Sequence, residues 1–301
     1  MNCRRPSGTF VIMIAAAAVA IAGVAPSLAC PANAAGSDLA PWVERLPRDG
    51  GVIFGVNLKK ATAGPAFGRI VESRKLKIVG RLMEFAEKAE IDPTRDIAGL
   101  AGVWNPGPDA GEDGAVIFTG TFDREKIESS IRSSFGTGVV FLDETALALG
   151  DIDHLEKMME VNERRRESVA ADRAMMSLVE EIDAGKMFWF AGEAADVLAM
   201  ASMDFPLGPG GGQIRKVAGA VDVADDVAGA VIALMADQAS AEKLAETVGG
   251  LILFAEMAGD ADPDVRKLLK SITVTRKDDL VRVDFSFPLA LYDRLVKLLN
   301  R

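Results

Sequence analysis

The chain has 301 residues, a formal net charge of −10 and an isoelectric point near 4.8. Because so acidic a protein repels phosphate backbones, this charge excludes nucleic acid as a partner. The two cysteines, Cys3 and Cys30, lie within the first 34 residues, so the rest of the chain contains no disulfide, thiolate nucleophile or cysteine-bound metal.

The first 34 residues have the layout of a secretory signal peptide. Arg4 and Arg5 precede an apolar stretch at 10–24, and the small residues at 32–34 match the pattern that a signal peptidase reads, so we expect cleavage after Ala34. A retained membrane anchor is the alternative. A stretch of 15 apolar residues rises only about 22 Å as a helix, however, and a bilayer core is about 30 Å thick.

Lipidation of Cys30 is a second alternative, which would make the protein a lipoprotein. Bacterial lipoprotein signals usually have a large aliphatic residue three positions before the cysteine and a small one two positions before it, whereas this chain has Ser27 and Leu28 there. One lipid chain alone would anchor the protein only weakly. We therefore expect a periplasmic or secreted protein, which meets a membrane only if the signal segment is retained or Cys30 is lipidated.

Hydrophobic periodicity predicts the elements that follow the signal peptide. Alternation of apolar residues predicts strands at 51–58, 97–105 and 115–122, and a hairpin at 138–150. Spacing of three to four residues predicts helices at 75–90 and 123–135, the second with Asp123 as N-cap. It also predicts a bridging helix at 153–182, for which a break near Ser168 is the alternative.

The same order of elements recurs in the second half of the chain. The expected elements are a strand at 186–192, a helix at 193–201, strands at 214–224 and 227–236, helices at 240–259 and 262–270, a hairpin at 271–287 and a closing helix at 288–300. The four residues Gly-Ala-Val-Ile begin a strand-like run in each half, at 114–117 and at 229–232. Repetition of a whole series of elements is typical of a duplicated unit.

The predicted fold is therefore α+β, with two tandem ferredoxin-like units. Each unit is of the βαββαβ type with an extra edge strand and helix, and its antiparallel sheet has helices on one face. We place the first unit at 35–152, a helical linker at 153–185 and the second unit at 186–301.

The inner strands have apolar or small residues on both faces, so their second faces need a cover. The other unit, the bridging helix, a second copy of the protein or an apolar ligand could supply it. Asn57, Trp104, Phe188 and Trp189 lie on these strands and are the candidate ligand-facing or partner-facing residues. For the two tryptophans, packing in the core is the competing interpretation.

Catalytic motifs are missing from the sequence. His154 is the one histidine, which excludes a catalytic triad and a three-histidine zinc site, and we interpret it as a structural or surface residue. The glycines at 208–212 are interpreted as a loop, the acidic segment at 260–264 as a turn that lacks the glycine and glutamate of a calcium loop, and the run Asn-Glu-Arg-Arg-Arg-Glu at 162–167 as a solvated surface. We predict no catalytic residue, no metal and no cofactor.

Four phrases of the sequence resemble those of uncharacterised exported proteins of deltaproteobacteria and related bacteria. They are LPRDGGVIFGVNLKK at 46–60, IDPTRDIAGLAGVWN at 91–105, GTFDREKIESSI at 120–131 and GKMFWFAG at 185–192. The resemblance covers most of the chain after the signal peptide. It implies export and the tandem α+β plan, and that group of proteins has no assigned activity.

Three functions are compatible with the sequence. The first is a non-enzymatic cell-envelope protein that binds another envelope protein or self-associates. The second is a carrier of an apolar small molecule or lipid between the two units, suggested by Met-rich and Phe-rich segments at 198–207 and 249–259. The third is an enzyme that uses only carboxylates, which would need a cleft of converging Asp and Glu with a raised pKa.

Overall fold

The structure, a computed structural model, describes residues 40–62, 86–87, 89–92, 95–106, 112–131, 138–200, 213–257 and 263–291. The predicted signal peptide, its cleavage after Ala34 and Cys30 lie outside the described residues. So do most of the helix predicted at 75–90, the glycines at 208–212 and most of the helix predicted at 288–300. None of the described helices combines the length and the hydrophobicity that crossing a bilayer requires.

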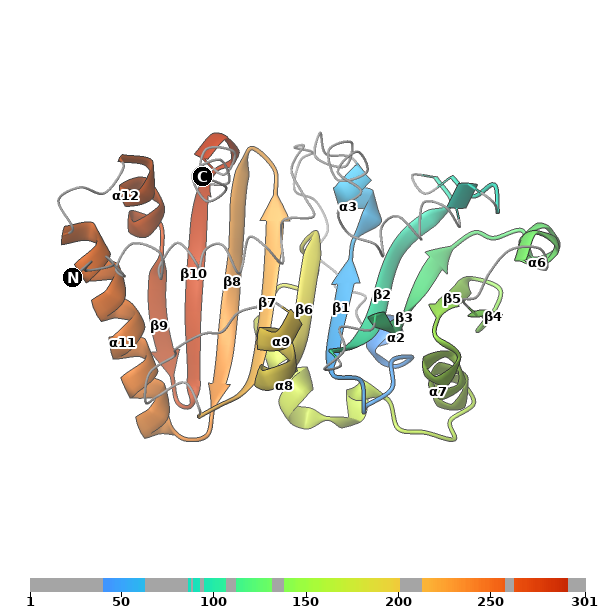
Figure 1. Ribbon diagram of the computed structural model, residues 1–301, viewed down its shortest axis with the longest axis horizontal. Coiled ribbons are helices and arrows are strands. Elements are labelled where there is room, and N and C mark those ends of the chain that lie inside the picture. Colours follow the sequence, from blue (N-terminus) through green and yellow to red (C-terminus); the bar gives the residue numbers. More distant parts are fainter. Residues whose placement is uncertain are drawn as a thin grey trace, which may run out of the picture.

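Antiparallel strands form one continuous sheet, which has ten strands in the described part of the chain (Figure 1). Their order is β4-β5-β3-β2-β1-β6-β7-β8-β10-β9. The strands are β1 (Val52–Val56), β2 (Ile97–Pro106), β3 (Glu112–Gly120), β4 (Gly138–Phe141), β5 (Ala146–Gly150), β6 (Phe188–Glu193), β7 (Ile214–Val223), β8 (Asp226–Met235), β9 (Thr273–Lys277) and β10 (Leu280–Pro288). The sequence predicts two sheets. The structure has one because β1 and β6, the innermost strands of the two halves, pair with each other.

The two halves have the same strand order when each is followed outward from this central pair. The first half runs β1-β2-β3-β5-β4, and the second runs β6-β7-β8-β10-β9. The recurring Gly-Ala-Val-Ile segments occupy corresponding places: Val116 of β3 lies opposite Gly102 of β2, and Val231 of β8 lies opposite Gly219 of β7. The repetition in the sequence is therefore also a repetition of register.

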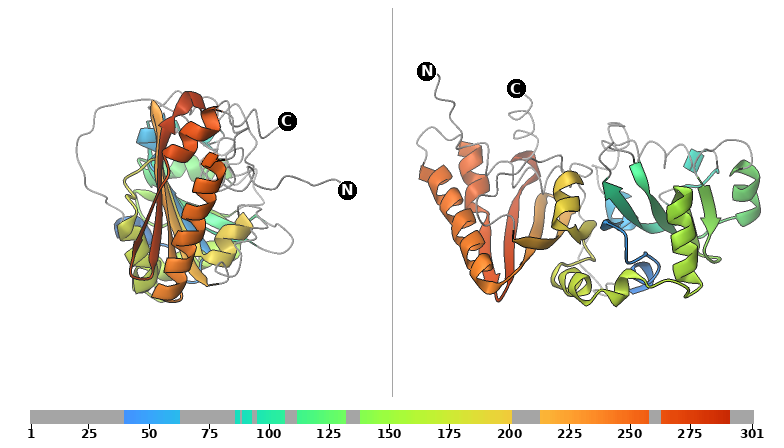
Figure 2. Two further views of the ribbon diagram at one scale, coloured as in Figure 1. Left: turned by 90° about the vertical axis from the view of Figure 1, so that its left-hand side faces the viewer. Right: turned by 60° about the horizontal axis from the view of Figure 1, so that its bottom comes forward.

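Helices lie on both faces of the sheet (Figure 2). The described helices are α2 (Ala40–Val43), α3 (Leu58–Thr62), α6 (Arg124–Ile131), α7 (Ile152–Asn162), the 3₁₀ helix η1 (Val169–Ala171), α8 (Arg173–Glu181), α9 (Ala194–Met200), α11 (Gln238–Met257) and α12 (Pro263–Lys270). Helices α3, α6, α9, α11 and α12 pack on what we call the first face, and α2, α7, η1 and α8 pack on the second face. The prediction of helices on one face only is therefore wrong, because inner strands that are apolar on both sides bury both.

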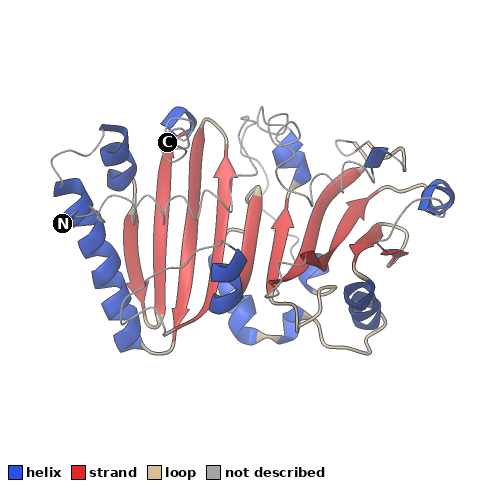
Figure 3. Cartoon of the chain, in the orientation of Figure 1, coloured by secondary structure: helices blue, strands red, loops and turns tan. Residues whose placement is uncertain are grey.

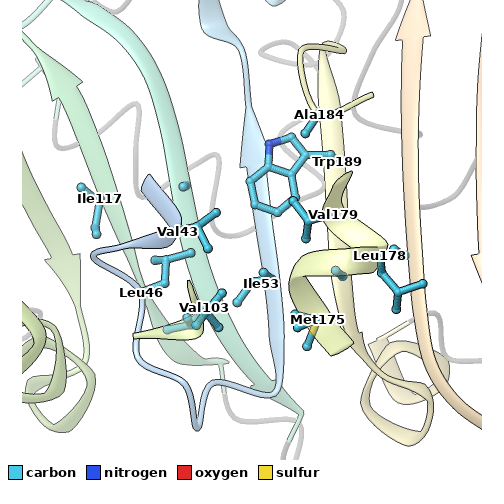
Figure 4. Close-up of a cluster of buried hydrophobic side chains, with 14 of the residues drawn as sticks. Val43, Leu46, Ile53, Val103, Ile117, Met175, Leu178, Val179, Ala184 and Trp189 are labelled. Atoms are coloured by element: carbon cyan, nitrogen blue, oxygen red, sulfur yellow. The ribbon is translucent and has the colours of Figure 1, made fainter. Parts of the chain in front are cut away.

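The segment that links the two halves provides the cover of the second face. Met175 and Leu178 of α8 and Leu155 of α7 belong to one buried cluster with Ile53 of β1 and Trp189 of β6. Figure 4 shows part of this cluster between the strands and α8. The sequence left four alternatives for what covers the second faces of the inner strands. In the structure, the bridging helical segment covers them. It also holds the halves together, because its side chains contact strands of both.

Candidate functional site

Polar groups, mostly side chains, lie close together where the central strands end, between α8 and α9. Asn105 is near the end of β2, Gly51 directly precedes β1, Glu193 ends β6 and Lys216 lies opposite it in β7. Helix α8 adds Asp172 from the second face, and α9 adds Asp196 from the first face. We call this set, with His154 of α7, the polar rim.

One part of the polar rim is a chain of hydrogen bonds that ends in the buried histidine. The backbone N–H of Gly51 donates to Oδ1 of Asn105 at 2.5 Å, and Nδ2 of Asn105 lies 3.2 Å from Nε2 of His154. Because Oδ1 of Asn105 accepts the N–H of Gly51, the amide nitrogen Nδ2 is the atom that faces the ring. His154 is 6% exposed, and its Nδ1 has no partner among the described residues. This histidine is buried, which agrees with the interpretation of His154 as a structural residue and not as a surface residue.

A second part of the polar rim is centred on Lys216. Its Nζ lies 3.2 Å from Oδ2 of Asp172 and also contacts Oε1 of Glu193. Burial alone would lower the pKa of the Lys216 ammonium, but the hydrogen bonds and charges of Glu193 and Asp172 outweigh it and raise the pKa. Asp172 also caps α8, because its Oδ1 accepts the N–H groups of Ala174 and Met175 at 3.0 Å. Lys216 is therefore a fixed cation that ties β7 to α8, not a neutral nucleophile.

Asp196 is the carboxylate of the polar rim that has no cation. A Cβ added at Gly51 would lie 3.0 Å from Oδ2 of Asp196 and 2.9 Å from Oδ1 of Asn105, so the two oxygens flank this glycine. Partial burial, followed by the charge of Glu193, raises the pKa of Asp196. Among the described residues it has no hydrogen bond or ion pair that would offset that burial.

An open groove of about 390 Å³ borders the polar rim between α8 and α9. Lys216 and Glu193 line it together with Arg215 and small residues of both helices. Arg215 is engaged elsewhere: its Nε donates to the carbonyl of Met235 at 3.1 Å, and its Nη2 lies 3.7 Å from Asp279. The charges facing this groove are therefore already paired, apart from that of Asp196 nearby.

The structure does not bring the four candidate residues together. Trp104 and Phe188 lie near opposite ends of β1, since Trp104 is opposite Val52 and Phe188 is opposite Val56. Trp104 is half-buried beside α9, at the polar rim, and Phe188 is half-buried on the first face.

The other two candidates have structural roles. Asn57 caps α3, because its Oδ1 accepts the N–H of Lys60 at 3.1 Å. Trp189 is 4% exposed and belongs to the buried cluster drawn in Figure 4. Its indole occupies the space that a Cβ on Gly55 would need. Sequence reasoning missed Asn105 and Asp196, which become neighbours only through the pairing of strands.

The aromatic side chains of the central strands leave little space for an apolar ligand. Phe188, Phe190 and Phe285 line a gap of about 10 Å³ on the first face. A single water molecule needs about 10–15 Å³ of such space. In the described part of the chain, this aromatic region is therefore filled by its own side chains.

The basic run at 162–167 joins two loops rather than forming a free cationic patch. Arg166 bridges Asp49, at 3.1 Å, and Glu160, at 2.9 Å. Glu167, the last residue of the run, lies 2.6 Å from Arg48. These pairs connect the segment before β1 to the segment after α7, in agreement with a solvated, paired surface.

Helix α11 carries an exposed apolar surface on its C-terminal half. Leu253, Phe254 and Met257 are 58%, 57% and 74% exposed. In the described part of the chain, a Cβ added at Gly249 or Gly250 would have no atom within 4 Å, so the space over both glycines is open there. We call these five residues the α11 patch. Figure 3 shows that α11 runs alongside the edge strand β9, at one end of the sheet.

Comparison with known proteins adds a structural neighbour. No family model and no curated protein matches the chain. The solved structure titled "Structure of crystal form IV of TP0453" is similar with a TM-score of 0.46 and 5% sequence identity, over 86% of this chain and 96% of that chain.

Proposed function

We propose that this chain is an exported, non-enzymatic cell-envelope protein that works by binding, and that the α11 patch joins two copies of it. The observation that carries the proposal is the exposure of Leu253, Phe254 and Met257 on a helix whose opposite side is packed against the sheet. Burying one such side chain fully contributes about 1.5–3 kcal/mol. Clustered apolar side chains of this kind mark interaction sites on soluble proteins.

The two glycines favour a second helix as the occupant of the α11 patch. A glycine within a helix costs about 1 kcal/mol relative to alanine. No described residue of the same copy fills the space over Gly249 and Gly250, so packing among the described residues does not explain them. Without a Cβ, they allow another backbone to approach closely.

A second copy of the same helix fits this surface because the patch is self-complementary. Gly250 and Phe254 are one helical turn apart on α11. In an antiparallel pair about a two-fold axis, Phe254 of each copy meets Gly250 of the other. From Thr247 to Met257 the one charged side chain is Glu256, which is half-buried. Two acidic chains can therefore meet here without placing like charges in contact.

We also propose that the chain is a duplication of a ferredoxin-like α+β unit, with units at 35–152 and 186–301 and the linker at 153–185. The common strand order of the two halves supports this. So does the common placement of Gly-Ala-Val-Ile in β3 and β8. Export is inferred from the pattern of the first 34 residues, together with the resemblance to exported proteins of deltaproteobacteria.

The test is the oligomeric state of the chain from residue 35 to residue 301. We expect sedimentation velocity to show a dimer that forms as concentration rises, in a weak equilibrium because one helix pair is smaller than a standard interface. Phe254→Asp should yield a monomer. Ile152→Asp changes an equally exposed apolar residue, 63% exposed on α7, and should leave the dimer intact.

Two results would contradict this assignment. A wild-type chain that stays monomeric at the highest soluble concentration would exclude self-association through the α11 patch. A dimer that persists in Phe254→Asp but is lost in Ile152→Asp would place the contact surface on α7 instead.

A further inference from the structure

The two halves of the sheet repeat one hydrogen bond. The N–H of Gly51, which precedes β1, donates to Oδ1 of Asn105 in β2. The N–H of Met187, which precedes β6, donates to Oδ1 of Asp222 in β7 at 2.8 Å. The register makes these positions equivalent, because each donor precedes the first residue of its strand and each acceptor follows that residue's cross-strand partner.

In the second half this acceptor has two cations. Oδ2 of Asp222 lies 3.7 Å from Nζ of Lys60, on α3, and 3.6 Å from Nζ of Lys186. The side chain of Asp222 is 35% exposed, and that of Lys186 is 23% exposed. The ammonium groups of the chain itself therefore neutralise this end of the central strands.

In the first half the corresponding places carry no cation. Phe54 and Phe190 are cross-strand partners at the junction of the halves, so they serve as a common origin. Lys60 is six residues after Phe54, and six residues after Phe190 the chain has Asp196. Likewise Lys186 is four residues before Phe190, and the residue four before Phe54 is a glycine.

Among the residues that the structure describes, no neighbouring group offers a replacement cation. Lys216 is held by Asp172 and Glu193, as described above. The flanking segments 107–111 and 201–212 contain no Lys, Arg or His. The carboxylate of Asp196 and Oδ1 of Asn105 thus face one position beside Gly51, next to the further negative charge of Glu193.

We propose that a primary ammonium group from outside the chain binds between Asp196 and Asn105, in the place that corresponds to Nζ of Lys60 beside Asp222. An ammonium group has three donors and no acceptor, and here it meets a carboxylate and an amide oxygen whose second lone pair is free. A calcium ion would need about six to eight oxygen ligands, more than these two side chains supply. The site is separate from the α11 patch and does not depend on the proposed self-association.

The ammonium can come from a lysine side chain of another protein or from a free amine, and two probes distinguish these sources. Nα-acetyl-lysine methylamide presents one side-chain ammonium on a peptide backbone, and 1,4-diaminobutane presents ammonium groups without a backbone. Titration of the ¹⁵N-labelled chain with each probe, followed by amide chemical shifts, should give saturable shifts at Gly51 and Asp196. The probe with the lower dissociation constant identifies the source.

Variants of the chain provide the controls. Asp196→Asn should weaken binding of the better probe at least about tenfold, because a hydrogen bond to a charged group is lost. Asp196→Lys should abolish it by placing an ammonium in the site. Glu125→Gln, which removes an equal charge from an exposed position on α6, should bind as the wild type does. Nα-acetyl-norleucine methylamide, which has no charge, should produce no saturable shift.

Two outcomes would overturn the proposal. One is the absence of saturable shifts at Gly51 and Asp196 with both probes in the wild-type chain. The other is equal binding by the wild type and Asp196→Asn, with both variants shown by circular dichroism to be folded.

Discussion

Phe54 and Phe190 lie directly opposite each other on β1 and β6, and each ring covers a glycine on the next strand outward. A Cβ added at Gly102 would be 2.7 Å from Cζ of Phe54, and one added at Gly219 would be 2.6 Å from Cε1 of Phe190. The two rings therefore occupy space that side chains of β2 and β7 would need. Glycine at these two positions is a consequence of the junction between the halves.

The first prediction concerns these glycines. Gly102→Ala should lower the free energy of unfolding by about 1–3 kcal/mol, as overpacking of a core does. Its Cβ would also lie 2.7 Å from the carbonyl oxygen of Ala115, which is backbone and cannot turn aside. Gly219→Ala should lower the free energy of unfolding by less than Gly102→Ala does. The closest neighbours of its added Cβ are ring atoms, and the nearest backbone oxygen is 3.2 Å away. Urea denaturation measures all these changes.

Gly249→Ala is the matched control for this prediction. The space over Gly249 is open, so the same substitution should raise the free energy of unfolding by about 1 kcal/mol through helix propensity. Equal effects at the three positions would show that the aromatic rings do not occupy the space assigned to them.

Much of the fold could be predicted from the sequence because alternation is a local signal. The hairpin predicted at 271–287 is formed by β9 and β10, and the predicted N-cap Asp123 accepts the N–H of Lys126 at the start of α6. The joining of two sheets into one could not be predicted. It depends on backbone pairing of β1 with β6, and the only trace of this pairing in the sequence is that both strands are apolar on both faces.

The polar rim could not be predicted for a related reason. Asn105 and Asp196 are separated by 91 positions, each with a local explanation as a strand end or an exposed helix residue. Their proximity follows from the register of β2, β1 and β6 and from the direction in which α9 leaves β6. Single-sequence patterns carry no information on such pairings between distant segments.

The second prediction uses the raised pKa of Asp196. Burial makes the ionised form less favourable in the folded state, so the folded-state pKa lies above the ordinary value of 3.8. Below a pH of 3.8, Asp196 is protonated in both the folded and the unfolded state, so it does not affect the free energy of unfolding. As the pH rises through the raised pKa, the wild type loses stability, so Asp196→Asn should become more stable than the wild type and remain so at neutral pH. Thermal unfolding between pH 3 and pH 8 measures this difference.

Asp172→Asn should behave in the opposite way and serves as the control. The pKa of Asp172 is lowered: burial raises it, but the hydrogen bonds from α8 and from Lys216 outweigh burial. Asp172 therefore stabilises the folded state at a pH above its ordinary pKa, and this stabilisation disappears as the pH falls through the lowered pKa. If Asp172→Asn raised the free energy of unfolding at neutral pH, Asp172 would not be stabilised by Lys216 and α8. If Asp196→Asn lowered the free energy of unfolding at neutral pH, burial would not destabilise the ionised form of Asp196.

The third prediction concerns Lys216, whose side chain is 12% exposed. Lys216→Met keeps the aliphatic part of the side chain but leaves Asp172 and Glu193 without their shared cation. We expect a loss of about 2 kcal/mol in the free energy of unfolding at neutral pH, as is typical for hydrogen bonds to charged groups. The loss should shrink at low pH, when both carboxylates are protonated.

Lys243→Met controls for the charge change in the third prediction. Lys243 is exposed on α11, so its replacement should alter the free energy of unfolding by less than about 0.5 kcal/mol. Equal losses for the two variants would mean that Lys216 acts only through the net charge of the chain, and not by tying β7 to α8.

The fourth prediction separates folding from assembly at the α11 patch. Gly250→Ala should stabilise a single copy by about 1 kcal/mol, because the added methyl group meets no atom of the described residues and alanine favours a helix. The same methyl group should weaken the dimer, because it fills the space through which the second α11 approaches. Thermal unfolding at low concentration and sedimentation equilibrium on one sample measure the two effects. The distinguishing result is that Gly250→Ala changes the stability of the monomer and the stability of the dimer in opposite directions. If Gly250 served flexibility alone, the substitution would leave the association constant unchanged. If Gly250 allows close contact between copies, the native glycine makes the monomer less stable and the dimer tighter than alanine does.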